Sequence, residues 1–296
     1  MRDKSRQQWR FDAVTVETRW QLAHGRHLDL GAKAVVMGVL NVTPDSFSDG
    51  GLFTAPERAL EQAQTMISEG AAIIDVGGES TKPGATPVSA AEEQDRVLPI
   101  IERLAERKDV LVSIDTYRAE TARLAIAAGA HIVNDVWGAQ RDPDIARVAA
   151  TTGAGLVLMH TSRERLIQPD PIADQFVFLE TSIAIARQAG VADSQIAVDP
   201  GFGFGKEDPE QNLQLMARFS ELVALGFPLV AGTSRKRFIG HVTGRQPADR
   251  GAGTAATSVI LRLAGAAIFR VHDVAINVDA LALADAMLAR RPSKEG

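Results

Sequence analysis

Short runs of apolar, often β-branched residues recur along the chain, and each is followed by a stretch in which apolar residues return every three or four positions. We expect eight of these runs to be strands: 35–41, 72–77, 110–115, 132–135, 155–160, 196–199, 228–232 and 268–273. The stretches that follow them, such as 55–69, 119–128, 142–152 and 179–189, have the spacing of helices with one buried face. Because the strand runs are continuously apolar, we expect both faces of the sheet to be covered.

The regular alternation of strand and helix predicts an α/β fold with a parallel sheet. Eight units favour a closed (β/α)8 barrel, or TIM barrel, over an open doubly wound sheet. We expect a single domain over residues 13–291, because no linker or low-complexity segment interrupts the series. A short N-terminal hairpin is predicted within 13–30, with Gly25 near its turn, as a cap on the lower end of the barrel. Residues 1–12 and 292–296 are expected to be tails.

Composition excludes several classes of protein. The chain has 296 residues, 45% of them hydrophobic and 23% charged, which is ordinary for a globular protein. It has no cysteine, which excludes disulfides, thiolate catalysis and Cys-ligated zinc and is in keeping with a cytoplasmic location. The formal net charge is −5 and Lys and Arg form no long stripe, so a nucleic-acid partner is disfavoured. No apolar stretch of roughly 18–20 residues predicts a membrane span, and no signal peptide is visible.

The polar residues that follow the apolar runs are the most informative feature of the pattern. Most predicted strands end in a carboxylate, an amide or a basic group: Asn41, Asp75, Asp115, Asn134, Asp135, His160, Asp199, Arg270 and His272. Any one of them could cap a helix. In a barrel of this type, however, the C-terminal strand ends line one mouth, where the active sites of the fold lie. We therefore expect a polar site at that mouth.

Two loops carry unusual sequences. The first, at 41–51, reads NVTPDSFSDGG, and the second, at 77–84, reads GGESTKPG. Turn-rich segments of this kind are common in solvated loops. A proline at the start and a Gly-Gly pair at the end also suit a lid that closes over a ligand.

Taken with five later stretches, these loops resemble the dihydropteroate synthase family. The matching stretches are 38–51, 73–85, 112–116, 131–135, 198–206, 232–236 and 270–274. They run from the first strand to the last in the family's order. The sequences NVTPDSFSDGG and DPGFGFGK are the most specific of them, because barrel packing requires neither.

The resemblance implies a condensation in folate biosynthesis. The amine of p-aminobenzoate displaces diphosphate from the methylene carbon of 6-hydroxymethyl-7,8-dihydropterin diphosphate, giving 7,8-dihydropteroate. The positions that match the family's pterin site are Asp115, Asn134, Met159, Asp199, Phe204 and Lys236. Those that match its p-aminobenzoate region are Thr81, Lys82, Pro83 and Ser234. The family is usually a homodimer, and the small-residue segment 248–267 could form a helix contact between copies; tight packing of this segment on the barrel is the alternative.

Three residues match the family's diphosphate site, namely Asn41, Arg270 and His272, and Asn41 also matches its Mg2+ position. Arg270 and His272 are two apart on one strand, so both should point to the same side. A structural pairing of these two residues with Asp273 is the alternative. The expected catalytic residues are Asn41, Asp45, Asp115, Arg270 and His272; Asp45 or Asp49 would accept the aniline proton or help to exclude water.

Two departures from the family pattern affect the expected pocket. Lys82 stands where the family usually has arginine, and lysine lacks the planar fork of donors. After the fifth strand the family commonly reads Met-His-Met-Gln-Gly, whereas this chain continues Met159-His160 with Thr-Ser-Arg-Glu-Arg. We expect these changes to alter the fit, and so the inhibition, of sulfonamides.

Two rival functions fit part of the pattern. A barrel that demethylates methyltetrahydrofolate for a corrinoid protein would share the Asp115, Asn134 and Asp199 positions, but it has no use for the first loop. A catalytically silent barrel could bind folate precursors or act as a scaffold. Asp199 alone could also be a cap preceding Pro200.

Overall fold

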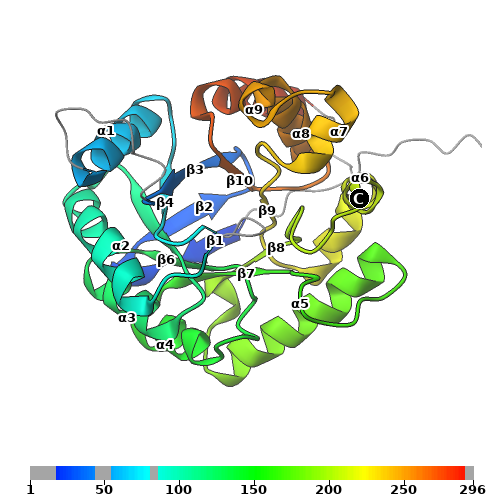
Figure 1. The fold of residues 1–296 in the computed structure, drawn as a ribbon. Helices are drawn as coiled ribbons and strands as arrows, with labels where there is room; N and C mark the ends of the chain where they lie inside the picture. Colours follow the sequence, from blue (N-terminus) through cyan, green and yellow to red (C-terminus); the bar gives the residue numbers. More distant parts are fainter. Residues whose placement is uncertain (1–17, 44–54, 81–85, 291–296) are drawn as a thin grey trace, which may run out of the picture.

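The structure, a computed structural model, describes residues 18–43, 55–80 and 86–290, and it contains a nearly closed barrel of eight parallel strands (Figure 1). The barrel strands are β3 (Val35–Asn41), β4 (Ile73–Gly77), β5 (Leu111–Asp115), β6 (Ile132–Asp135), β7 (Gly155–Met159), β8 (Ile196–Asp199), β9 (Val230–Ala231) and β10 (Ile268–Val271). Their order is β8-β7-β6-β5-β4-β3-β10-β9, and a single bridge from Val198 to Leu229 links the two ends. The predicted barrel is confirmed.

Helices surround the strands on the outside of the barrel (Figure 1). They are α1 (Ala55–Ser68), α2 (Ala90–Ala105), α3 (Ala119–Ala127), α4 (Asp144–Thr152), α5 (Pro171–Gln188), α6 (Pro209–Ala217), α7 (Arg237–Thr243), α8 (Gly251–Leu263) and α9 (Val274–Leu288). Short 3-10 turns are η1 (Ala23–Gly25), η3 (Asp193–Gln195), η4 (Phe219–Leu225) and η5 (Pro247–Asp249). No helix in the described ranges is long and apolar enough to cross a membrane.

Alternation along each strand divides the apolar residues into two cores. On β3, for example, Val36 and Leu40 belong to the outer core beneath the helices, whereas Met37 belongs to the core inside the barrel. The inner core also contains Ile73, Leu111 and other residues from the lower parts of the strands. Successive side chains of a strand point to opposite faces, which explains the division.

The N-terminal hairpin closes the lower end of the barrel. Strands β1 (Thr18–Gln21) and β2 (His27–Leu30) pair antiparallel, and Gly25 lies in the turn between them. Trp20 is buried in the inner core and donates a hydrogen bond from Nε1 to the carbonyl of Gln195, at 2.7 Å. The hairpin prediction is confirmed for its described part; the rest of that segment and the expected tails lie outside the described residues.

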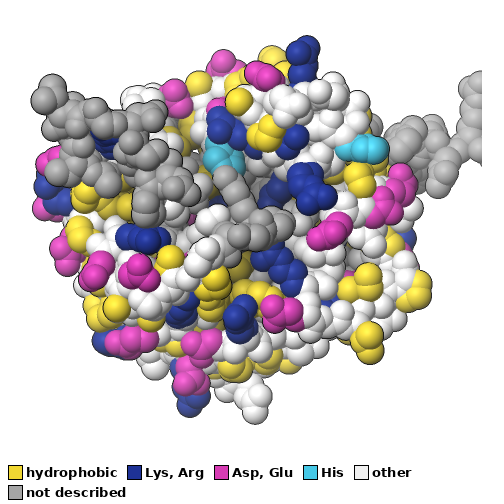
Figure 2. Space-filling view, in the orientation of Figure 1, with side chains coloured by type: hydrophobic (Ala, Val, Ile, Leu, Met, Phe, Trp, Pro, Cys, Tyr) yellow, Lys and Arg dark blue, Asp and Glu magenta, His cyan; other side chains and the backbone are white. Residues whose placement is uncertain are grey.

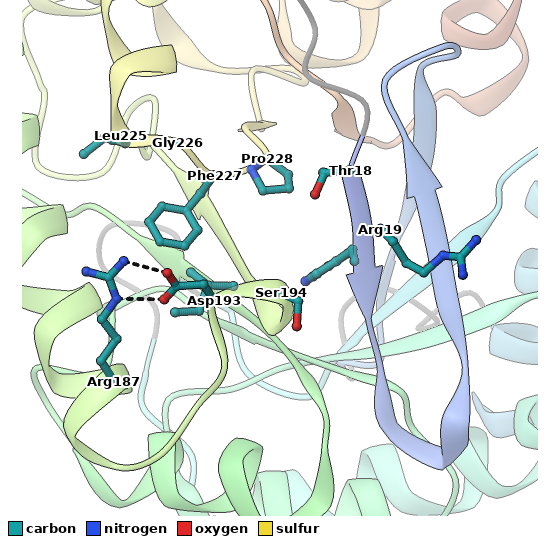
Figure 3. Close-up of a pocket in the computed structure, with 11 residues that line it drawn as sticks. Thr18, Arg19, Arg187, Asp193, Ser194, Leu225, Gly226, Phe227 and Pro228 are labelled. Atoms are coloured by element: carbon teal, nitrogen blue, oxygen red, sulfur yellow. Dashed lines mark hydrogen bonds and ion pairs between the residues drawn. The ribbon is translucent and has the colours of Figure 1, made fainter.

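A pocket of about 440 Å³ lies beside this hairpin, at the N-terminal ends of β8 and β9 (Figure 3). Its wall includes Arg187, whose guanidinium binds both carboxylate oxygens of Asp193 at 2.7 and 2.8 Å. Active sites of this fold lie at the opposite, C-terminal ends of the strands. The active site is therefore expected at the other mouth of the barrel, at the C-terminal ends of the strands.

Candidate active site

Above the apolar inner core, the side chains that point into the barrel are polar, and Arg270 on β10 connects two of them by hydrogen bonds. Its Nε donates to Oδ2 of Asp75 on β4 at 2.6 Å, and a terminal nitrogen donates to Oδ2 of Asp115 on β5 at 2.6 Å. Asn134 on β6 donates to the same oxygen of Asp75 at 3.1 Å. Residues from four strands thus form one connected network at the level of the upper barrel.

Asp75 is a central member of this network; the sequence pattern placed it at the mouth but gave it no role in binding or catalysis. The side chain is fully buried, and its Oδ1 has no hydrogen-bond partner among the described residues. The Oγ of Ser113, which lies opposite Asp75 in the β4–β5 register, has none there either. Unpaired buried oxygens cost free energy, so these two atoms mark a point where a polar ligand can add hydrogen bonds.

Asp115 and Asp199 are carboxylates held away from water. Burial raises the pKa of Asp115 to about 7, although Arg270 opposes the shift. Burial also raises the pKa of Asp199 to about 6, against a hydrogen bond that its Oδ1 accepts from the Gly201 N–H at 2.7 Å. Asp199 therefore does bind the turn after Pro200, as the capping alternative suggested, but with one oxygen only. Its Oδ2 lies on the side of Gly232: a β-carbon added to that glycine would stand 3.5 Å from Asp199 Oδ2.

An apolar wall stands beside these carboxylates. Val136, Met159 and Phe204 form a small buried cluster that is separate from both cores, with Tyr117 and Trp137 packed against it. The ammonium of Lys236 lies 4.1 Å from the centre of the Phe204 ring, and burial lowers its pKa to about 8. We call this arrangement, a polar floor next to an apolar wall, the slot; its chemistry suits a flat heteroaromatic ring with hydrogen-bonding edges.

His272 and Ser234 contact each other at the rim of the slot. Ser234 Oγ lies 3.1 Å from the backbone nitrogen of His272 and 3.0 Å from its Nδ1. Burial, followed by the charge of Arg270, lowers the pKa of His272 to about 3, so its imidazole is neutral at pH 7. The alternative pairing with Asp273 is wrong, because Asp273 binds Arg235 at 2.5 Å and Arg270 binds Asp75 and Asp115.

Asn41 reaches the same rim from the end of β3. In the strand register Asn41 lies opposite Gly77, which in turn lies opposite Asp115. A β-carbon at Gly77 would stand 3.7 Å from Asn41 Oδ1 and 3.6 Å from the β-carbon of Asp115. Because Gly77 has no side chain, the space between the Asn41 amide oxygen and the Asp115 side chain stays open, and one ligand there can face both groups.

His160, expected at the mouth, does not line the slot. It follows Met159, which points inward, so its ring points the other way and is fully buried. There Nε2 lies 2.9 Å from Asp174 Oδ2, and Nδ1 lies 3.0 Å from the ammonium of Lys206. Burial lowers the pKa of His160 to about 3, so its ring is neutral at pH 7. With Asp174 and Lys206 it forms a buried cluster behind the slot.

The structure brings together most of the predicted site residues: Asn41, Asp115, Asn134, Met159, Asp199, Phe204, Ser234, Lys236, Arg270 and His272 all lie at the C-terminal ends of the strands. Asp45, Asp49, Thr81, Lys82 and Pro83 lie outside the described residues. Within the described part, no three His, Cys, Asp or Glu side chains form a metal cluster. Figure 2, which looks along the barrel, shows Lys and Arg side chains near the centre of this face, on a chain whose formal charge is −5.

The barrel is that of a family of pterin-binding enzymes, because a family model described as pterin binding enzyme matches residues 37–272. The dihydropteroate synthase of Bacillus subtilis strain 168 is 47% identical over 256 residues, which cover 86% of this chain and 89% of that protein. The chain belongs to the dihydropteroate synthase family.

Solved structures agree with this assignment. The dihydropteroate synthase of Xanthomonas albilineans with 4-aminobenzoic acid superposes with a TM-score of 0.87 at 42% identity, covering 93% of this chain and 100% of that one. The same enzyme in complex with 7,8-dihydropteroate gives a TM-score of 0.83 at 40% identity, covering 92% and 100%.

Proposed function

We propose that this chain catalyses the reaction of its family at the slot, and that the residues of the slot bind the three parts of the substrates separately. The reaction joins p-aminobenzoate to 6-hydroxymethyl-7,8-dihydropterin diphosphate, giving 7,8-dihydropteroate and diphosphate. The observation that supports this most directly is the network in which Arg270 links Asp75 and Asp115 beside Asn134, all facing into one barrel mouth. Neither rival function accounts for a family of relatives named dihydropteroate synthase.

The pterin ring is assigned to the polar floor. Adjacent N–H donors of a 2-amino-4-oxo ring match a carboxylate, which accepts two parallel hydrogen bonds. Asp199 offers Oδ2 for one of them and the second acceptor site of Oδ1, beside its bond from Gly201, for the other. Asn134 and Asp115 face the remaining edge, and Lys236 donates to ring acceptors. Met159 and Phe204 supply the apolar surface against which the ring packs. Burial raises the pKa values of Asp115 and Asp199 because it disfavours their ionised forms. A ligand that donates hydrogen bonds to these carboxylates would stabilise the ionised forms.

The diphosphate is assigned to the rim formed by Asn41, Arg270 and His272. Arg270 keeps its charge, because Asp75 and Asp115 raise its pKa although burial acts in the other direction. A neutral His272 donates a hydrogen bond to phosphate without adding charge. The Asn41 Oδ1 is a hard oxygen beside Asp115, a donor set that fits Mg2+ completed by diphosphate oxygens and water. When bound there, Mg2+ would neutralise negative charge on the diphosphate.

Catalysis then consists of positioning and charge stabilisation. Ser234 at the rim, with Thr81, Lys82 and Pro83, is assigned to p-aminobenzoate, so that its amine approaches the methylene carbon from the side away from the diphosphate. The new C–N bond forms as the C–O bond to diphosphate breaks, and Arg270 stabilises the negative charge on the departing oxygens. The amine loses one proton, and Asp45 or Asp49 on the first loop is assigned to accept it.

A coupled assay tests this function. The wild-type chain should release pyrophosphate only when both the pterin diphosphate and p-aminobenzoate are present. The variant Asp199→Asn should lower kcat/KM for the pterin diphosphate by about 100-fold, because one floor carboxylate is lost. Arg187→Gln, in the pocket at the other end of the barrel, is the control and should be unchanged. Absence of pyrophosphate release by the wild type would refute the proposal.

We further propose that the chain forms a homodimer through α8 and α9. An apolar groove of about 420 Å³ between these helices is lined by small and aliphatic side chains, and one of them, Leu283, is 76% exposed. Exposed apolar patches of this kind mark protein contacts. Sedimentation should give a dimer for the wild type and a monomer for Leu283→Glu; a wild-type monomer at micromolar concentration would refute the interface.

A further inference from the structure

Lys206 is a buried cation that the proposed reaction does not use. It lies between β8 and α6, and its side chain is only 6% exposed. Its ammonium lies 2.9 Å from the carbonyl oxygen of Gly201 and 3.0 Å from Nδ1 of His160, and it forms no ion pair with any described carboxylate. Burial lowers the pKa of Lys206 to about 7, because it disfavours the charged form. A buried charge without an ion pair costs free energy, which favours a role in binding over a role in stability.

Gly201 connects Lys206 to Asp199. The Gly201 N–H donates to Asp199 Oδ1 at 2.7 Å, while its carbonyl accepts from the Lys206 ammonium and from the Phe204 N–H at 3.1 Å. Gly201 has a φ of 62°, and a β-carbon there would stand only 1.9 Å from the His160 carbonyl oxygen, so the turn packs directly on the backbone after β7. The peptide groups on the two sides of Gly201 are therefore held, one by the floor carboxylate and one by the buried lysine.

The turn around Lys206 also has neutral supports. Asn212 Oδ1 accepts from the Gly203 N–H at 2.7 Å, and Asn212 Nδ2 donates to the Lys206 carbonyl at 2.9 Å. Gln175 Nε2 donates to the Pro200 carbonyl at 3.2 Å. Because these contacts carry no charge, the Lys206 ammonium adds what they cannot, a positive charge behind the floor of the slot.

The charges of Lys206 and Asp199 stabilise each other. After burial, Asp199 has the largest influence on the Lys206 pKa, and it raises that pKa. In the other direction, Lys206 lowers the pKa of Asp199, after Lys236 and Arg270. The other charged or titratable groups that face Lys206 are Asp174, Arg165, Lys236 and His160. The acid and the arginine of that set pair with each other, so Asp199 is the main anion on which the Lys206 charge acts.

We propose that Lys206 is a positioning residue for pterin binding, which holds the Gly201 turn and keeps the Asp199 carboxylate ionised for the ligand. The inference rests on the proposed function, in which Asp199 accepts hydrogen bonds from the pterin. Lys206 contacts the turn from behind, so it acts through Gly201 and through its charge. The ligand that benefits is a ring with adjacent N–H donors, since an ionised carboxylate accepts both hydrogen bonds.

Calorimetric titration of Lys206→Met with 6-hydroxymethylpterin at two pH values tests the proposal. A charged Lys206 lowers the pKa of Asp199, which is about 6, so its loss should raise that pKa and reduce the ionised fraction at low pH. The ratio of the variant Kd to the wild-type Kd should therefore grow by about fivefold from pH 8 to pH 6, which corresponds to a tenfold change in the acid constant of Asp199. Ionisation of the ligand itself cancels in this ratio. At pH 8, where Lys206 is mostly uncharged, the variant should bind only a few-fold more weakly.

Lys108→Met is the matched control, because it removes an exposed lysine just before the N-terminal end of β5. Its Kd should equal that of the wild type at both pH values. A Lys206→Met ratio that does not grow toward pH 6 would mean that the residue only supports the fold, and it would overturn the proposal. A wild type that binds no pterin would instead refute the proposed function, and this inference with it.

A second measurement leaves Lys206 in place, so it remains valid if Lys206→Met does not fold. The interaction is reciprocal, so Asp199→Asn should lower the pKa of Lys206 below its wild-type value. NMR of lysine labelled with 13C at Cε follows this titration. If Lys206 titrates identically in Asp199→Asn and in the wild type, the proposal is wrong.

Discussion

Arg270 on β10 donates a hydrogen bond from Nε to Oδ2 of Asp75 on β4 at 2.6 Å, although 195 residues separate them along the chain. The same guanidinium reaches Asp115 with a second nitrogen, also at 2.6 Å. A planar fork spanning two buried carboxylates fixes the side chain in one orientation. In the proposed function, the rim assigned to diphosphate is therefore preorganised before substrate arrives, which is how positioning lowers a barrier.

The first prediction concerns this fork. Arg270→Lys should lower kcat/KM for the pterin diphosphate by about 100-fold, because an ammonium cannot hold both carboxylates and still meet phosphate. Steady-state pyrophosphate release measures the effect. Arg187→Lys makes the same change in the exposed pair with Asp193 and should behave as wild type. Near-normal activity of Arg270→Lys would contradict the assigned role.

The second prediction concerns pH. The floor carboxylates must be ionised to accept hydrogen bonds from the pterin, and the pKa values of Asp199 and Asp115 are about 6 and about 7. The value of kcat/KM for the pterin diphosphate, which reports ionisations of the free enzyme and free substrate, should therefore fall as pH drops below this range. It should also fall as pH rises above the Lys236 pKa of about 8, because the donor charge is lost.

The Lys236→Arg variant separates the two limbs. Arginine stays protonated throughout the accessible range, so the decline above pH 8 should disappear while the acidic limb remains. A flat profile for the wild type between pH 5 and pH 9 would be inconsistent with the floor carboxylates and Lys236 acting as described.

The third prediction concerns the cluster behind the slot. Although burial opposes it, hydrogen bonds from His160 and Arg165 lower the pKa of Asp174. Asp174→Ala should reduce the free energy of unfolding by about 3–5 kcal/mol, since the buried His160 and the partly buried Arg165 lose the carboxylate that they bind. Urea unfolding at pH 7 measures it, where Asp174 is fully ionised in the wild type.

Asp193→Ala is the matched control for that experiment. Its pair with Arg187 has side chains that are more than half exposed, so the loss should be within about 1 kcal/mol. Equal destabilisation by the two variants would show that the Asp174 cluster does not support the fold in the way its burial implies.

Periodicity was sufficient to predict the barrel, because each strand and helix carries its own local pattern. The exceptions have local causes. Strand β9 spans only Val230 and Ala231, although the apolar run 228–232 is longer. Helix α5 begins at Pro171, well before the expected 179, because Asp170 caps it by accepting a hydrogen bond from the Ile172 N–H at 3.2 Å. An Asp-Pro pair is a helix-start signal that the apolar pattern alone does not include.

The convergence of polar side chains at one mouth could be predicted where strand position alone decides it. Asp115, Asn134 and Asp199 converge because parallel strands end at one mouth. The Asp75–Arg270 pair could not be anticipated, since it depends on which levels of two distant strands coincide across the barrel. His160 was misplaced because adjacent strand residues point to opposite sides, and Met159 takes the inward position.

Calorimetric titration with 6-hydroxymethylpterin, which has the ring but no diphosphate, tests the central claim that the barrel mouth is a pterin site. At pH 8 the wild type should bind about one equivalent, and Asp199→Asn should bind about 100-fold more weakly, since a two-bond carboxylate contact is lost. Asp193→Asn at the opposite end should bind like the wild type. Absence of binding heat in the wild type, or equal affinity of Asp199→Asn and wild type, would contradict the account.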